Sequence, residues 1–252
     1  MGIETKGTLS VIIPCFNEEE TILDLLYKVA AQVEVGEIIV IDDHSTDSSL
    51  RRIGEFKDSR LILIKQSANF GKGKAVSAGF KIATKPYVVI QDADLEYDPS
   101  EYPDLLEPIV LGRADVVFGS RFLSGGTRRV LYYWHSLGNK FLTTLSNIFT
   151  DLYLSDMETC YKVMTRRVAQ SLKIQENRFG IEPEMTAQIA AMKVRIYEVS
   201  ISYYGRTYDE GKKITWRDGF SALRCILKYN SPRYKKEYFN NYRDENINLK
   251  ES

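Results

Sequence analysis

The chain has 252 residues, of which 44% are hydrophobic, and its 34 basic residues balance 34 acidic ones. This length can bury one substantial core, and the zero net charge argues against binding of nucleic acid through a global electrostatic field. Three widely spaced cysteines, Cys15, Cys160 and Cys225, argue against a disulfide framework or a structural zinc site and suit a reducing compartment.

The sequence shows no pattern typical of a targeting or membrane-spanning segment. There is neither a signal-peptide pattern nor an apolar run of roughly 18 residues that could span a membrane, so we expect a cytoplasmic protein. We expect a single domain at residues 1–229, with one half at 1–121 and the other at 122–229. A polar, extended tail is predicted at 230–252.

The first half of the sequence alternates apolar runs, typical of strands, with helical patterns. Five strands are predicted, at Leu9–Pro14, Glu37–Asp43, Arg60–Gln66, 87–90 and Ala114–Arg121. The helices between them include one capped by residues 17–20, one opening at residues 69–74 (NFGKGK) and one at Pro99–Val110. This alternation predicts an α/β fold with a mostly parallel central sheet, right-handed crossovers and helices on both faces.

The NFGKGK segment places glycines beside lysines at a helix start, where backbone N–H groups can bind a phosphate. The segment matches neither the P-loop nor the dinucleotide-binding pattern. The sequence therefore favours the helix start over a phosphate site.

The second half begins with a glycine-containing loop and then an aromatic-rich segment, Val130–Leu154, which one helix or two could form. Large aromatic residues beside Arg128 and Arg129 are typical of a helix at a membrane interface, and packing on the protein's own sheet is the alternative. Two further strands are predicted, at 158–165 and 195–204. Helices are predicted at 166–174, through Glu184 to Met192, and at 214–229. In the last of these helices the side chains expected to face inward are Phe220, Leu223, Ile226 and Leu227.

Three acidic residues, Asp92, Asp94 and Glu96, follow the buried strand at 87–90. Alternate residues of an extended chain point the same way, so these carboxylates converge if the strand geometry continues past Gln91. Three hard oxygen ligands suit Mg²⁺ or Mn²⁺, which also bind substrate phosphates. The alternative is that the acids only cap a turn and the next helix.

Several strings in this order carry a resemblance to a known family: PCFNEEETI, VIDDHSTDSS, NFGKGKA, IQDADLEYDP, FGSRF, DMETCYK and GRTYDEGKKITWRDGF. The chain resembles family 2 glycosyltransferases of the GT-A fold, most of all the dolichol-phosphate mannosyltransferase group and its bacterial polyprenyl-phosphate relatives. The resemblance extends to about Tyr229. It implies a GT-A fold for this chain.

The resemblance also implies roles for individual residues. Donor binding is assigned to Pro14, Phe16, Glu18, Ile41, Asp43, Asp92, Ala93, Asp94, Arg206 and Lys212, or Lys213 in place of Lys212. Asp92, Asp94 and Glu96 would hold the metal, although the family often has Gln where this chain has Glu96. Arg121 and Arg129 would meet the acceptor phosphate. Asp156 and Glu158 lie where related transferases keep a catalytic base, and either could instead order the acceptor pocket or an arginine.

The implied activity is an inverting transfer of a hexose from a nucleotide-diphosphate sugar, GDP-mannose or a UDP-sugar, to a polyprenyl or dolichyl phosphate, with Mg²⁺ or Mn²⁺ as cofactor. Asp92, Asp94, Arg121 and Asp156 would be catalytic. The aromatic segment would then bring the protein to the cytoplasmic face of a membrane as a peripheral enzyme. The alternatives are transfer to a saccharide hydroxyl in cell-wall or surface-polysaccharide synthesis, a sugar nucleotidyltransferase, and a silent nucleotide-binding module.

Overall fold

The computed structural model describes residues 5–123, 130, 132–178, 180–205 and 216–248. Its strands are β1 (Leu9–Cys15), β2 (Val35–Asp42), β3 (Leu61–Lys65), β4 (Tyr87–Ile90), β5 (Val116–Ser120), β6 (Lys162–Thr165) and β7 (Ile196–Ser200). Its helices are α1 (Ile22–Ala30), α2 (Ser49–Glu55), α3 (Lys72–Ile82), η1 (Pro99–Glu101), α4 (Tyr102–Val110), α5 (Tyr133–Thr150), α6 (Arg166–Ser171), α7 (Ile181–Ala191), α8 (Trp216–Tyr229) and α9 (Pro232–Asn248).

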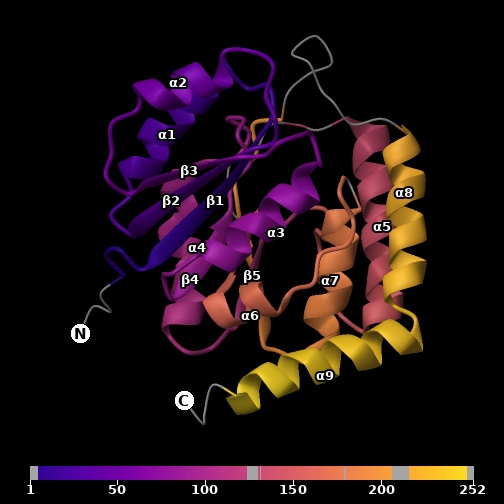
Figure 1. The fold of residues 1–252 in the computed structure, drawn as a ribbon. Coiled ribbons are helices and arrows are strands. Elements are labelled where there is room, and N and C mark those ends of the chain that lie inside the picture. The colour runs from indigo at the N-terminus through magenta and orange to yellow at the C-terminus, as the bar shows by residue number, and fades with distance from the viewer. Residues whose placement is uncertain (1–4, 124–129, 131, 179, 206–215, 249–252) are drawn as a thin grey trace.

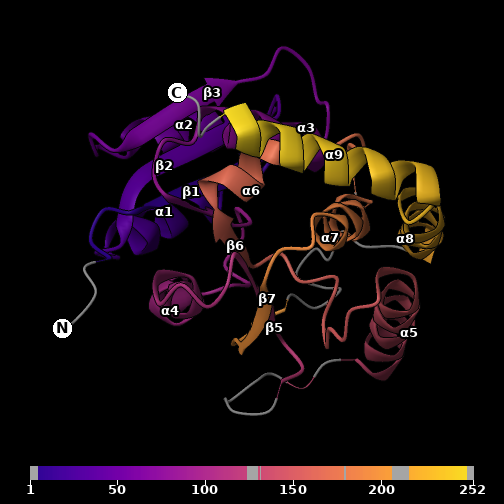
Figure 2. The same cartoon turned by 90° about the horizontal axis from the view of Figure 1, so that it is seen from below.

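All seven strands form one sheet in the order β3-β2-β1-β4-β6-β5-β7. Only β6 runs antiparallel to its neighbours, which confirms the predicted mostly parallel α/β sheet. Helices α1 and α4 cover one face of the sheet, and α3 and α6 cover the other (Figures 1 and 2). Strands β1 and β2 are buried on both faces because their apolar runs lie between these two layers.

Helix α1 begins at Ile22, later than the predicted acidic cap. Asn17 has a left-handed backbone (φ 54°), and its side-chain oxygen accepts the Thr46 N–H at 2.8 Å. The Glu18 N–H donates to Ser49 Oγ at 2.8 Å. The polar residues before α1 therefore join the loops after β1 and β2, and they do not cap the helix.

The glycines of NFGKGK are explained by packing. Gly71 has a φ of 93°, and a Cβ on Gly73 would lie 1.9 Å from the carbonyl oxygen of Glu176. The Gly73 N–H donates to Asn177 O at 2.9 Å, and the Gly71 N–H donates to Asp43. These groups hold the start of α3 against the loop before α7 and the loop after β2, which supports the helix start that the sequence favours.

The predicted extended tail is wrong, because residues 232–248 form helix α9 across the ends of α6 and α7 (Figure 1). Tyr234, Tyr238 and Tyr242 recur every fourth residue and so share one face of the helix. Tyr238 is buried with Tyr229 and Cys225. The average composition of this segment is polar, so composition alone does not predict the apolar stripe.

Helix α8 also differs from its prediction. Ile226 is buried as expected, but Phe220 and Leu227 are exposed, and the inward positions include Ala222, Cys225 and Tyr229. Among the described residues, no helix is long and apolar enough to cross a bilayer.

Candidate active site

Parallel pairing brings the carboxyl ends of β1, β2 and β4 to one edge of the sheet. The loop after β1 contacts the loop after β4, because Thr21 Oγ1 donates to the Ala93 carbonyl oxygen at 3.0 Å. The loop after β2 binds the start of α3, because Asp43 accepts the N–H groups of Phe70 and Gly71 at 2.7 Å each. Ligands of open α/β sheets bind beyond such an edge.

The predicted nucleotide-binding residues lie along this edge but differ in exposure. Phe16 is 40% exposed, whereas Ile41 and Asp43 are buried. Pro14 is half-buried in β1, and Glu18 accepts the Thr21 hydroxyl at 3.1 Å. Phe16 therefore presents a ring to solvent, while Ile41 packs in the core and Asp43 shapes the neighbouring loop.

The acidic trio does not converge as the strand geometry predicts. Strand β4 ends at Ile90 and the backbone bends at residues 93–97, so the regular alternation of an extended strand does not continue through the trio. Asp94 Oδ1 accepts the Glu96 N–H at 3.1 Å, and Glu96 Oε2 accepts the Tyr203 hydroxyl at 2.8 Å. Within the described part of the chain, no three His, Cys, Asp or Glu side chains are grouped to hold a metal.

Asp92 and Asp94 still offer carboxylate oxygens at the ligand-binding edge of the sheet. Mg²⁺ is commonly held by one or two carboxylates, with substrate phosphates and water as the other ligands. These two residues fit a metal bound in that manner. A site preassembled from all three acids does not fit this arrangement.

Asp92 is paired with a lysine that the sequence did not single out as a site residue. Lys72 Nζ, at the start of α3, lies 2.8 Å from Asp92 Oδ1 and 3.0 Å from Glu182 Oε1. Burial alone would lower the pKa of Lys72, but the charge of Asp92, with that of Glu182, holds this pKa well above its ordinary value. The presence of Lys72 within NFGKGK was the only sequence signal for this contact.

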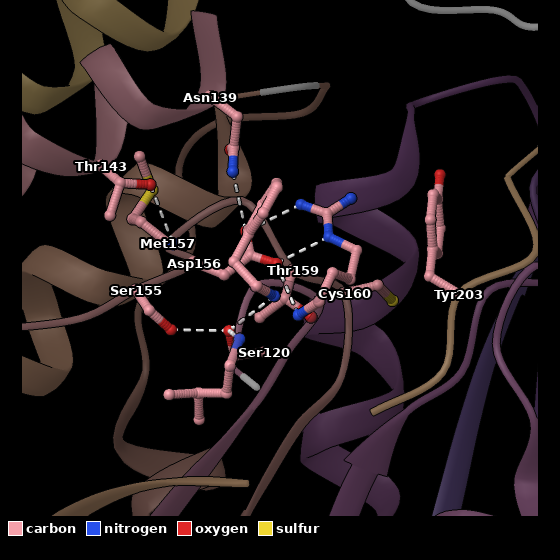
Figure 3. Close-up of polar contacts among 12 residues, drawn as sticks. Ser120, Asn139, Thr143, Ser155, Asp156, Met157, Thr159, Cys160 and Tyr203 are labelled. Atoms are coloured by element: carbon pink, nitrogen blue, oxygen red, sulfur yellow. Dashed lines mark hydrogen bonds and ion pairs between the residues drawn. The ribbon is translucent and has the colours of Figure 1, made fainter. Parts of the chain in front are cut away.

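Asp156 binds Arg121 through both carboxylate oxygens. Arg121 Nε lies 2.6 Å from Oδ2 and Nη2 lies 2.8 Å from Oδ1. Asn139 Nδ2 donates a further hydrogen bond to Oδ1 at 3.1 Å (Figure 3). Asp156 is fully buried. Burial alone would raise the pKa of Asp156, but the charge and hydrogen bonds of Arg121 outweigh it and lower that pKa. This geometry matches the alternative in which Asp156 orders an arginine.

The Arg121 guanidinium also stacks on an aromatic ring that contacts the acidic loop. Its carbon lies 5.0 Å from the centre of the Tyr203 ring, within cation–π range. Because the Tyr203 hydroxyl donates to Glu96, this ring joins Arg121 to the loop that carries Asp92 and Asp94. The structure thus brings Arg121, Asp156 and Glu96 into one connected group.

Glu158 has a different environment from Asp156. Its Oε1 atom is buried and has no hydrogen-bond partner among the described residues. Burial, with the nearby charge of Glu182, raises the pKa of Glu158 to about 8. Of the two candidate bases, Asp156 forms an ion pair with Arg121, whereas Glu158 forms no ion pair among the described contacts.

Glu158→Gln is expected to raise the melting temperature by several degrees at pH 8 and by little near pH 4.5. Between these values the unfolded chain has released the Glu158 proton while the folded chain retains it, so stability falls as pH rises. The glutamine variant removes this loss. Thermal melts across the pH range measure the effect, and a difference that stays constant with pH would contradict it.

Helix α5 packs in an unusual sense, with polar residues inward and aromatic residues outward. Its buried residues are Thr143 and Ser146, while Trp134 is 77%, Phe141 60% and Ile148 71% exposed. Thr143 Oγ1 accepts the Met157 N–H at 3.2 Å (Figure 3). The segment forms one helix, which packs on α7 and α8.

The predictions for Arg129, Arg206, Lys212 and Lys213 fall outside the described residues. Of the other predicted site residues, the structure brings Glu18 and Ala93 together through Thr21, and Arg121 and Asp156 directly.

The sequence of this chain is similar to those of known glycosyltransferases. A sequence model described as Glycosyl transferase family 2 matches residues 10–172, more than half of the chain. The low-salt glycan biosynthesis hexosyltransferase Agl6 of Haloferax volcanii is 29% identical over 90% of this chain. The dolichol-phosphate mannosyltransferase of Pyrococcus furiosus is 28% identical over 87% of it. This chain spans only 54% and 63% of the lengths of these two relatives.

Solved structures share the fold. Glucosyl-3-phosphoglycerate synthase from Mycobacterium tuberculosis, in complex with Mn²⁺, UDP and phosphoglyceric acid, aligns with a TM-score of 0.69 at 19% identity and covers 89% of this chain and 78% of its own. The same enzyme in complex with Mg²⁺ and UDP gives a TM-score of 0.67 at 20% identity, covering 88% of this chain and 78% of its own.

Proposed function

Because this chain belongs to glycosyl transferase family 2 and has the GT-A fold, we propose that it transfers a hexose, with inversion, from a nucleotide-diphosphate sugar to a polyprenyl or dolichyl phosphate. The mannosyltransferase relative from Pyrococcus furiosus supports a lipid-phosphate acceptor. The complexes of the mycobacterial synthase with UDP support a nucleotide donor. GDP-mannose and a UDP-sugar are the two donors to test first.

The donor would lie beyond the carboxyl ends of β1, β2 and β4, with the exposed Phe16 ring against the base and Glu18 nearby. Asp92 and Asp94 would hold Mg²⁺ or Mn²⁺, and the complexes of the mycobacterial synthase with either ion support this choice. When bound, such an ion neutralises negative charge on the departing diphosphate. Arg206 and Lys212 would add charge-assisted hydrogen bonds to the same group.

One observation carries the lipid acceptor: helix α5 contacts the Arg121–Asp156 pair and exposes an apolar face. Asn139, on α5, donates to Asp156, while Trp134, Phe141 and Ile148 point to solvent. A lipid phosphate at Arg121 could then extend its chain along α5, with Arg129 as a second phosphate contact. A face of this kind is typical of helices that lie in a membrane interface.

Trp134→Ser/Phe141→Ser is expected to weaken binding to vesicles containing anionic lipid by about tenfold or more, because two large apolar side chains are lost from the contact. Co-sedimentation with vesicles measures the partition. Tyr27→Ser is the matched control, because Tyr27 is an exposed aromatic residue on α1, away from α5 (Figure 1). Equal partitioning of both variants would contradict the proposed membrane contact.

Transfer to a saccharide hydroxyl is the second candidate, and Glu158 favours it. A hydroxyl acceptor must lose a proton during attack, and a carboxyl with a pKa of about 8 is suited to accept it. A lipid phosphate is already ionised at neutral pH and requires no base. Loss of transfer to a saccharide in Glu158→Gln, with donor binding retained, would support this second candidate.

The experiment that tests the proposal starts with thermal shifts of the protein with a panel of nucleotide sugars, with and without Mn²⁺. A bound donor stabilises the native state by mass action, so the largest shift identifies it. The selected donor is then incubated with a polyprenyl phosphate, and release of nucleoside diphosphate is measured. Release of pyrophosphate from a nucleoside triphosphate would indicate a nucleotidyltransferase. Donor binding without turnover on any acceptor would indicate a silent module.

A further inference from the structure

The contact between Lys72 and Asp92 has a consequence for metal binding. Lys72 Nζ lies 2.8 Å from the Asp92 carboxylate, so an ammonium already occupies the position where a cation would approach that oxygen. The predicted metal site therefore contains a positive charge supplied by the chain itself. A divalent cation must share Asp92 with this ammonium or displace it.

Glu182 is a second partner of the same ammonium. Its Oε1 lies 3.0 Å from Lys72 Nζ, and its side chain is only 10% exposed. Lys72 thus lies between two carboxylates from different elements, with Asp92 after β4 and Glu182 on α7. If Lys72 leaves Asp92, its charge remains paired with Glu182, so the movement leaves neither charge isolated.

We propose that Lys72 is a built-in counter-ion that keeps a divalent metal from binding Asp92 until a nucleoside diphosphate supplies further ligands. This proposal rests on the metal-dependent function proposed above. In the empty site, Lys72 neutralises Asp92 and a metal gains few ligands. With a diphosphate present, phosphate oxygens add ligands and negative charge, and Lys72 releases Asp92 while it keeps its contact with Glu182.

The proposal makes metal and nucleotide binding synergistic. Binding of Mn²⁺ alone should be weak, and GDP or UDP should strengthen it by about tenfold or more, which is the usual size of coupling between two ligands. Such coupling would limit metal binding to donor-loaded enzyme.

The experiment measures Mn²⁺ binding directly, through the electron paramagnetic resonance signal of free Mn²⁺, with no substrate turnover. Lys72→Met is expected to bind Mn²⁺ alone about tenfold more tightly than the unmodified chain, because Asp92 loses its internal cation. Lys74→Met is the matched control: it removes the same charge two residues along α3, from a side chain with no ion pair to Asp92 among the described contacts. It should bind Mn²⁺ like the unmodified chain.

Glu182→Gln gives a test in the opposite direction. It removes the carboxylate that would keep Lys72 paired after it releases Asp92, so Lys72 stays on Asp92 and Mn²⁺ binding in the presence of GDP or UDP should weaken. A shape-matched amide at this site limits disturbance of α7, and circular dichroism checks that the variant is folded.

The outcomes separate this inference from the proposed function. If the unmodified chain binds Mn²⁺ with a nucleotide but Lys72→Met binds Mn²⁺ alone no better than Lys74→Met, the counter-ion role is overturned and the metal-dependent function stands. The counter-ion role also fails, by itself, if the unmodified chain binds Mn²⁺ alone as tightly as it does with nucleotide. If Mn²⁺ does not bind the unmodified chain with GDP, UDP or their sugars, the metal-dependent function and the counter-ion role both fail.

Discussion

Asp94→Asn is expected to lower sugar transfer by about 10²–10³-fold or more while the protein remains folded. Asparagine keeps a side-chain oxygen that can accept the Glu96 N–H, so the turn after β4 is preserved and only the negative charge is lost. Asp94 is preferred to Asp92 for this test, because a substitution at Asp92 would also break its ion pair with Lys72. The measurement is release of nucleoside diphosphate from the donor that the thermal-shift panel selects.

Asp98→Asn is the control for this variant. Asp98 lies in the same loop, and its Oδ1 accepts the Ser100 N–H at 3.0 Å to cap η1, which asparagine can also do. Asp98→Asn should retain nearly full transfer. Normal transfer by Asp94→Asn would contradict the proposal that the loop after β4 binds the metal.

Asp156→Ala is expected to destabilise the protein by about 3–5 kcal/mol, because it leaves the largely buried Arg121 guanidinium without its counter-charge. Denaturation with urea, followed by circular dichroism, measures the change. A residue acting only as a catalytic base would lose activity without this loss of stability. The prediction therefore distinguishes an arginine-holding role of Asp156 from the alternative role of base.

The double variant Arg121→Met/Asp156→Leu removes both charges and is expected to recover most of this stability, since apolar residues of similar volume commonly replace a buried ion pair at little cost. Transfer should remain low in the double variant if Arg121 contacts the acceptor phosphate. A double variant as unstable as Asp156→Ala would show that the pair is not the source of the loss.

Much of the architecture was predictable because its signals are local. The apolar runs of β1 and β2 are buried on both faces, and the spacing of Ile22, Leu25, Leu26 and Val29 places one face of α1 in the core. Helix α9 is not predicted from the sequence because its stripe of tyrosines lies within a polar composition, and the stripe finds partners on α6, α7 and α8, which are distant in the sequence or become neighbours only in the fold.

The candidate site was predictable in position but not in its contacts. The order of motifs along the chain predicts that Asp92 and Asp94 lie at the carboxyl edge of a parallel sheet. Whether three carboxylates converge there depends on how the backbone turns after Ile90, and alternation along an ideal strand cannot supply that information.

By itself, the sequence determined the α/β class, the position of the acidic loop and the family, because strand patterning and motif order are properties of neighbouring residues. Only the tertiary structure decided which charges meet. Lys72 and Glu182 lie 110 residues apart, and Arg121 and Asp156 lie 35 apart. Their pairing depends on the folded chain, which brings the start of α3 to both the loop after β4 and α7, and brings Asp156 to the end of β5. Charges that are largely buried in this way require partners.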